Sequence, residues 1–391
     1  MTLPAPPGPA RRLASPAPER ARPERRARPR LPPVRPIAFL LLLWLIHAFM
    51  IVYVSLAPFG PWEPWGSLQW RFLFAPLPRH ITPFDLLINV LAYLPLGWLA
   101  AAAAARRCSG GRAVLFATVL AAVLSLVMES LQVLLPPRIP SNVDLVTNTL
   151  GALLGALPWR RPAITRHVLQ ALERWRDGWL APGWEPEFGL LLVLLWCACQ
   201  LNPSIPFLGA GVLRNPDMLA WSDLRPDPAD WGLQALAAGL GLCGLGLFLA
   251  CLVLPRRSAP LLTLVLLLLV MAAKATAAEW LLKPVLANDW FGSATLAGLA
   301  SGAVLLVLTR RLRLRARAIT AGVCLLAGGL LAKLGGHYLA LWEMRSLFGW
   351  NFGQLRSFTG LTVWLNEIWP LLAVLFLALW WPRAPQVSST D

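Results

Sequence analysis

The chain has 391 residues, of which 57% are hydrophobic and 14% are charged. Soluble domains carry about 25% charged residues, so this composition excludes an ordinary soluble globular protein. The formal net charge of +16 is compatible with a nucleic-acid partner, but the basic residues lie between long apolar runs, as they do in the loops of membrane proteins. We therefore expect the lipid bilayer, and not nucleic acid, to be the main partner.

The first segment, residues 1–36, contains eleven prolines and nine arginines and almost no bulky apolar residue. Such a segment cannot bury enough apolar surface to fold, so it is expected to be a disordered, basic cytoplasmic tail. The apolar run that follows, 37–56, is longer than the core of a signal peptide, which has about 7–15 residues. It is therefore predicted to stay in the protein as a membrane anchor.

Ten apolar runs follow one another along the chain, each close to the length that crosses a ~30 Å hydrocarbon core as a helix. They are residues 37–56, 85–105, 113–135, 143–158, 188–207, 231–254, 260–282, 292–309, 316–342 and 359–381. We expect an all-α, polytopic transmembrane helix bundle of about ten spans. The run 188–207 is interrupted by Asn202 and Pro203, but without it every later loop would change sides.

The basic residues alternate between the two sides that ten spans define. With the N-terminus inside, 25 of the 35 Lys and Arg residues fall in inside segments and eight fall outside. Lys274 and Lys333 lie within runs. This bias follows the positive-inside rule and predicts that the N-terminus and the C-terminus are both cytoplasmic.

Residues 159–187 are expected to hold an amphipathic helix on the cytoplasmic surface, because apolar residues recur there at helical spacing. These residues are Ile164, Val168, Leu172, Trp175 and Trp179. The segment divides a four-span unit, 37–158, from a six-span unit, 188–382, and residues 383–391 form a short polar tail. Tryptophans next to the runs are expected at the membrane interface, as at Trp62, Trp65, Trp70, Trp290 and Trp350.

Polar residues gather at the outer ends of three consecutive runs of the four-span unit. Helical spacing places Asp85 with Asn89, Glu129 with Gln132, and Asp144 with Asn148 on shared faces, and Arg138 lies in the tight loop before Asp144. Because the topology brings these ends to one side of the membrane, the sequence predicts that they form one outward-facing cluster. Gly151 and Gly155 continue the last stripe as a packing face of small residues.

The cluster has two interpretations. In one it is a buried polar network in which carboxylates pair with Arg138 and amides hold helices together. In the other it is a ligand site, with Arg138 anchoring an anion through its fork of donors and Glu129 or Asp144 acting as general acid or base or as a cation ligand. The ligand-binding residues would be Asp85, Asn89, Glu129, Gln132, Arg138, Asp144 and Asn148.

The same residues carry a family resemblance. The string formed by Asp85, Asn89, Pro95 and Gly97, then Glu129 and Gln132, then Arg138, Asp144, Asn148, Thr149 and Gly151, resembles the VanZ-like membrane protein family over about residues 40–160. The resemblance implies a bacterial protein of the cytoplasmic (inner) membrane with a role in the cell envelope. It also implies a link to glycopeptide antibiotic resistance, but no defined reaction. The six C-terminal spans lie outside it.

We expect the outward site to bind or act on a lipid-linked, anionic or surface glycan component of the envelope. One alternative is a proton-coupled transporter that uses Glu129, Lys333 and Glu367 as a relay. Another is a non-catalytic scaffold for envelope-assembly enzymes. Nothing in the sequence sets an oligomeric state.

Five further polar residues, Lys274, Glu279, Lys333, His337 and Glu367, lie in the outer halves of C-terminal spans. They are expected either to pair internally and reach outward, or to form a second wall of the same cleft. His47 is expected to be a hydrogen-bonded core histidine. The six cysteines show no zinc spacing and are interpreted as small apolar residues. No metal site, cofactor motif or recognisable enzyme signature is present, so no cofactor is expected.

Overall fold

The computed structural model describes residues 37–57, 59–67, 70–76, 83–108, 110–136, 138–182, 185–209, 228–284, 287–288, 290–334 and 353–380. These residues form an all-helical protein, with no β-strand among them. The helices are α1 (Ile37–Leu56), α2 (Pro83–Ala104), α3 (Gly110–Gln132), α4 (Asn142–Ala156), α5 (Pro162–Trp179), α6 (Glu185–Gln200), α7 (Pro228–Leu252), α8 (Ala259–Leu281), α9 (Ser293–Thr309), α10 (Leu314–Leu334) and α11 (Gly353–Trp380). Short 3₁₀ segments occupy Trp65–Ser67, Trp70–Phe74 and Leu157–Arg160.

Each predicted apolar run overlaps one helix, and the all-α prediction is confirmed. Within the described residues, six helices (α2, α3, α7, α8, α10 and α11) are long and apolar enough to cross a membrane, and α1 and α9 are shorter apolar helices. The chain is thus a multi-pass membrane protein. Two of the predicted spans are short as helices, because α4 has 15 residues and α6 has 16. A helix of 15 residues extends about 22 Å.

The N-terminal four helices pack around a contact between α2 and α4 that only glycines permit. A Cβ atom on Gly151 would collide with the carbonyl oxygen of Val90, and one on Gly155 would collide with that of Leu94. A step of four residues along α4, from Gly151 to Gly155, corresponds to a step of four residues in the same direction along α2, from Val90 to Leu94, so the two helices run parallel. The predicted small-residue face is confirmed as the surface on which α4 meets α2.

The C-terminal helices surround α7, whose apolar stretch is the most buried of the six candidate spans. A Cβ atom on Gly298 of α9 would lie 2.6 Å from the carbonyl oxygen of Ala235 on α7, so small residues again let two helices approach closely. The largest hydrophobic core is made of residues from this part of the chain, including Phe248, Leu325 and Trp369. Separate cores lie among α1 to α4.

The predicted span 188–207 is helical only as far as Gln200. Residues 201–209 leave the helix as irregular backbone that is buried over most of its length, with Asn202, Ile205 and Phe207 almost inaccessible. Pro203 cannot donate a helical hydrogen bond, and its ring disfavours helix at Asn202. Irregular backbone at membrane depth is tolerated where protein surrounds it, which is the case here.

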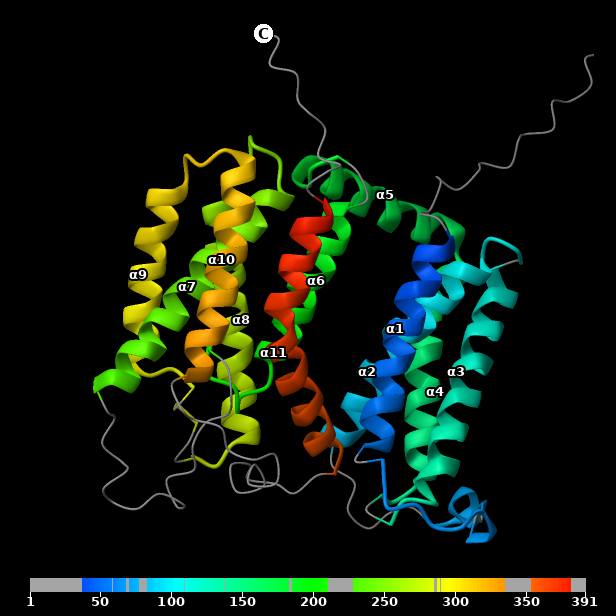
Figure 1. The fold of residues 1–391 in the computed structure, drawn as a ribbon. Helices are drawn as coiled ribbons and strands as arrows, with labels where there is room; N and C mark the ends of the chain where they lie inside the picture. The colour runs from blue at the N-terminus through cyan, green and yellow to red at the C-terminus, as the bar shows by residue number, and fades with distance from the viewer. Residues whose placement is uncertain are drawn as a thin grey trace, which may run out of the picture.

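The predicted amphipathic helix is present as α5 and lies across one end of the bundle (Figure 1). Its first turn is tied to the N-terminal helices by a hydrogen bond from Thr165 to the Pro158 carbonyl at 2.6 Å. Its last turn is tied to the α7–α8 connection, where Arg257 donates to the Gly178 carbonyl at 2.6 Å and stacks over Trp179 at 4.7 Å. Leu172 and Trp175 are exposed on α5.

Figure 1 places the beginning of α1 and the end of α11 at the same end of the bundle as α5. The connections α2–α3, α7–α8 and α9–α10 lie at this end too, and they carry most of the basic residues of the described loops. The 3₁₀ segments Trp65–Ser67 and Trp70–Phe74 and the α3–α4 connection lie at the opposite end, whereas Leu157–Arg160 leads from α4 into α5. We call these the basic end and the opposite end of the bundle.

Candidate functional site

The carboxyl end of α1, at the opposite end of the bundle, is held by two polar side chains from the α3–α4 hairpin. Gln132 Nε2 donates to the Ser55 carbonyl at 2.9 Å. Arg138 donates to the Val54 carbonyl at 2.7 Å and to the Ala57 carbonyl at 2.6 and 3.1 Å. The last carbonyls of a helix lack partners and carry partial negative charge, so a cation and an amide donor stabilise them.

The amino end of α4, which carries partial positive charge, is paired with the carboxylate of Glu129. Ser141 is its N-cap, and its hydroxyl accepts from the backbone N–H groups of Val143 and Asp144. The backbone N–H of Ser141 donates to Glu129 Oε2 at 2.8 Å. A carboxylate at the amino end of a helix is stabilised by the helix dipole. The positive Arg138 thus lies at the partially negative carboxyl end of α1, and the acidic Glu129 lies at the partially positive amino end of α4.

These charges act on one another. The charges of Asp144 and Arg138 both reach the Glu129 carboxylate, which is 3% exposed. Burial lowers the pKa of the Arg138 guanidinium, and the nearby Glu129 carboxylate opposes that shift. The structure thus brings Glu129, Gln132, Arg138 and Asp144 together, as the sequence predicts.

One turn deeper, amide side chains from α2 and α4 meet a hydroxyl from α3. Asn148 Nδ2 donates to Ser125 Oγ at 2.9 Å, and the buried Tyr93 interacts with the same Ser125 side chain. The parallel packing of α2 and α4 places Asn89 at the level of Asn148. Two buried atoms here, Asn89 Nδ2 and Asn148 Oδ1, have no hydrogen-bond partner among the described residues. One is a donor and the other an acceptor, so the site offers both to a polar group.

Asp85 lies on α2 one turn before Asn89, but its side chain is outside the described part of the structure. Asp144 occupies the equivalent position on the parallel helix α4, because it precedes Asn148 by four residues, as Asp85 precedes Asn89 on α2. Both helices carry the pattern D-L-x-x-N-x-L-x-x-L, at 85–94 and 144–153. The sequence analysis missed this short repeat, and it also missed Ser125 and Tyr93, which stand four residues from Glu129 and Asn89.

A second buried polar group lies in the C-terminal helices, around the irregular segment after α6. Lys274 is fully buried, and its Nζ donates to the carbonyls of Gln200 at 3.0 Å and Asn202 at 2.7 Å. Asn202 Nδ2 donates to Thr362 Oγ1 on α11 at 2.8 Å. The expectation that Lys274 pairs with a carboxylate and reaches outward is wrong, because the end of α6 supplies carbonyl oxygens inside the protein.

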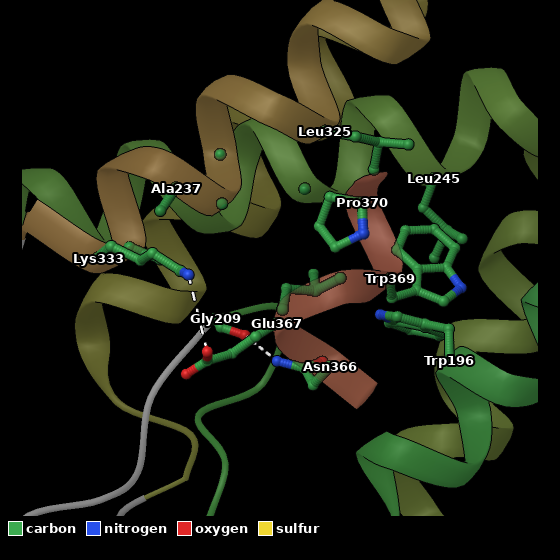
Figure 2. A pocket seen from close by; sticks show the side chains of 15 residues that line it. Trp196, Gly209, Ala237, Leu245, Leu325, Lys333, Asn366, Glu367, Trp369 and Pro370 are labelled. Carbon is green, nitrogen blue, oxygen red and sulfur yellow. Dashed lines mark hydrogen bonds and ion pairs between the residues drawn. The ribbon is translucent and has the colours of Figure 1, made fainter. Parts of the chain in front are cut away.

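Figure 2 shows a small cavity beside this group, between α10 and α11. Lys333 Nζ lies 3.7 Å from Glu367 Oε2, which confirms the expected internal pair, and Asn366 Nδ2 donates to the Gly209 carbonyl at 3.1 Å. Pro370 follows in the same helix and cannot donate to the carbonyl of Asn366. The cavity has a volume of about 50 Å³. This is room for one or a few water molecules and not for a sugar or a lipid headgroup.

The structure also tests the expectations for His47 and for the tryptophans assigned to the membrane interface. His47 donates from Nε2 to the Ala92 carbonyl of α2 at 2.7 Å, as expected for a core histidine. Trp290 is buried against Phe207, with ring centroids 6.0 Å apart, so its assignment to the membrane interface is wrong. Trp62, Trp65 and Trp70 are exposed at the opposite end.

Glu279 is exposed near the end of α8, while His337 and Trp350 lie outside the described residues. All six cysteines are free thiols, and four of them are buried. Within the described ranges, no group of three or more His, Cys, Asp or Glu side chains is placed to hold a metal ion.

The fold and the polar cluster together define a polytopic helical membrane protein with a buried polar site at one end of its first four helices. Residues 37–164 are a VanZ-like segment, since they match the family model described as VanZ/LLP1. The segment contains α1 to α4 and every residue of the predicted site. No curated protein and no solved structure matches the chain significantly.

Proposed function

We propose that the protein is a ten-span protein of the bacterial cytoplasmic membrane, with both termini in the cytoplasm. The gathering of basic loops at the end of the bundle that carries α5 supports this orientation. The exposed Leu172 and Trp175 on α5 suit a helix that lies in the membrane interface. In this orientation the Glu129 cluster faces the outside.

We propose further that the cluster binds a lipid-linked or surface glycan component of the cell envelope. The observation that carries this proposal is the pair of unpartnered buried atoms, Asn89 Nδ2 and Asn148 Oδ1, at one level of α2 and α4 beside Glu129. Buried polar atoms are nearly always hydrogen-bonded, and an exception indicates a missing partner. A sugar offers hydroxyl groups that donate and accept at once, which matches an amide donor and an amide acceptor.

The roles differ from those first expected for the arginine. Arg138 and Gln132 donate hydrogen bonds to carbonyls at the end of α1, so they position the site and are not assigned to the ligand. Asn89, Asn148 and Asp85 would bind the ligand. Glu129 and Asp144 would accept hydrogen bonds from it or act as general base.

The test compares a deletion strain complemented with the wild type, Asn148→Leu or Glu129→Gln. Thr118→Val is a matched control, because Thr118 lies on α3 and, among the described residues, its hydroxyl bonds to the Val114 carbonyl of its own helix. Membrane abundance, lipid-linked precursors, surface glycans and glycopeptide susceptibility are measured in each strain. We expect altered envelope profiles for the two site variants at normal abundance. Unaltered profiles at normal abundance would leave a scaffold that only packs its helices here.

A proton-coupled transporter is the second candidate, and the Lys333–Glu367 pair beside a water-sized cavity favours it. Glu129 belongs to α3 in the N-terminal helices, whose cores are separate from the core that lies beside Lys333 and Glu367. A relay would therefore be limited to the C-terminal helices. Proton uptake into proteoliposomes under an imposed membrane potential tests this function. Equal rates for the wild type and Glu367→Gln would exclude it.

A further inference from the structure

A large cavity lies at the basic end of the C-terminal helices and belongs to neither polar group. Its volume is about 480 Å³, within the range of small-molecule sites in proteins. It opens between α7, α8, α9 and α10, next to the turn that joins α5 to α6. Small residues on one face of α7, Gly246, Ala250 and Cys251, leave the space between these helices.

Three arginines from three separate elements line this cavity. Arg257 comes from the α7–α8 turn, Arg310 from the end of α9 and Arg317 from the first turn of α10. Glu185 is the acidic residue among the lining side chains. The cavity therefore carries a net positive charge above an apolar floor that includes Leu247 and Leu306.

Two of the arginines are held in place by bonds that leave other donors available. Arg317 donates to the Ala250 carbonyl at 3.0 Å and to the Leu312 carbonyl at 3.2 Å. Among the described residues, Arg257 donates from Nε to the Gly178 carbonyl, and it stacks on Trp179. Arg310 is exposed, and its side chain makes no hydrogen bond or ion pair with any described residue. A guanidinium stays charged and offers paired donors that match a phosphate.

We infer that this cavity binds an anionic phospholipid of the adjacent leaflet, with its phosphate at the three arginines and an acyl chain against the apolar floor. A free phosphate would satisfy the arginines but would leave the apolar floor without a partner. An uncharged lipid would cover the floor but not the charges. Basic pockets between membrane helices at the cytoplasmic side recognise anionic headgroups by this combination.

The test uses the full-length protein, purified in detergent and stripped of lipid. Phosphatidylglycerol and phosphatidylcholine with identical acyl chains are added in equal amounts, and the retained lipid is measured by native mass spectrometry. The wild type should retain phosphatidylglycerol in preference. Arg310→Ala should weaken its apparent affinity about fivefold, and Arg310→Glu should weaken it further.

Arg313→Ala is the matched control. Arg313 belongs to the same basic stretch and is exposed, but it does not line the cavity. Its removal should change phosphatidylglycerol retention much less than Arg310→Ala does. Because neither side chain bonds to a described residue, the melting temperatures of both variants should equal that of the wild type.

Three results would overturn the inference. Equal losses for Arg310→Ala and Arg313→Ala would mean diffuse attraction to a basic surface. Equal retention of the two lipids would mean an apolar groove without headgroup recognition. Displacement of phosphatidylglycerol by inorganic phosphate or glycerol 1-phosphate, at concentrations comparable with the lipid, would mean a site for a soluble phosphate.

Discussion

The guanidinium of Arg138 donates twice to the carbonyl oxygen of Ala57, from Nη2 at 2.6 Å and from Nε at 3.1 Å. This pair joins the loop between α3 and α4 to the first residue after α1. It explains why an arginine, and not a simple positive charge, stands at this position.

Arg138→Lys should therefore lower stability. Lysine keeps the charge but has no fork, so at least one bond to the end of α1 is lost, at a cost of about 1–3 kcal/mol. Thermal unfolding in detergent and membrane abundance should both fall. Arg71→Lys is the control, because Arg71 is exposed at the same end of the bundle. Normal stability of Arg138→Lys with a lost envelope phenotype would instead assign Arg138 to an anionic ligand.

Gly155→Leu should separate α2 from α4. Any side chain at Gly155 meets the Leu94 carbonyl, which belongs to a helix backbone and cannot rotate away. Overpacking of this kind costs about 1–3 kcal/mol, and α4 carries Asn148, so both stability and the site should suffer. Gly111→Ala is the control, since a Cβ atom there meets nothing within 4 Å. A Gly155→Leu protein as stable as Gly111→Ala would contradict the close packing of these helices.

Lys274→Met should destabilise the C-terminal helices. The change preserves much of the volume of the side chain but leaves the carbonyls of Gln200 and Asn202 without the donor that they now share. Unpaired buried acceptors cost about 1–3 kcal/mol each. Limited proteolysis should cut the segment after α6 faster in this variant than in Arg311→Met, an exposed basic residue. Equal protection of the two variants would show that the buried ammonium does not hold this segment.

The proposed topology makes a direct prediction for reporter fusions. Fusions after residues 110, 170, 257 and 314 should report the cytoplasm, and fusions after 75, 139 and 287 should report the outside, because the basic loops lie at one end of the bundle. Further external fusions after 220 and 350 fall outside the described residues. A cytoplasmic signal after 220 would remove α6 from the set of spans.

The sequence predicts most of the helices because membrane spans need long apolar runs, and these leave a strong local signal. The predicted span 188–207 extends past the end of α6 at Gln200. Asn202 and Pro203 mark the interruption in the sequence, but hydropathy does not show that the residues after the helix stay buried as irregular backbone. Gln200 and Asn366 were not singled out, and Asn202 was noted only as an interruption of a run, because amides and threonines in an apolar run have no spacing that marks them as a group. They meet only when α6 and α11 pack, although they are more than 150 residues apart.

The sequence by itself determined the helical class, the charge bias of the loops and the VanZ-like pattern from Asp85 to Gly151, because each depends on residues close together in the chain. Only the tertiary structure decided that Arg138 holds the end of α1, that Glu129 faces the start of α4, and that Lys274 is enclosed by carbonyl oxygens. Those partners are backbone groups, and every residue has them. Their identity is therefore absent from the sequence pattern and is set when helices distant in the chain come together.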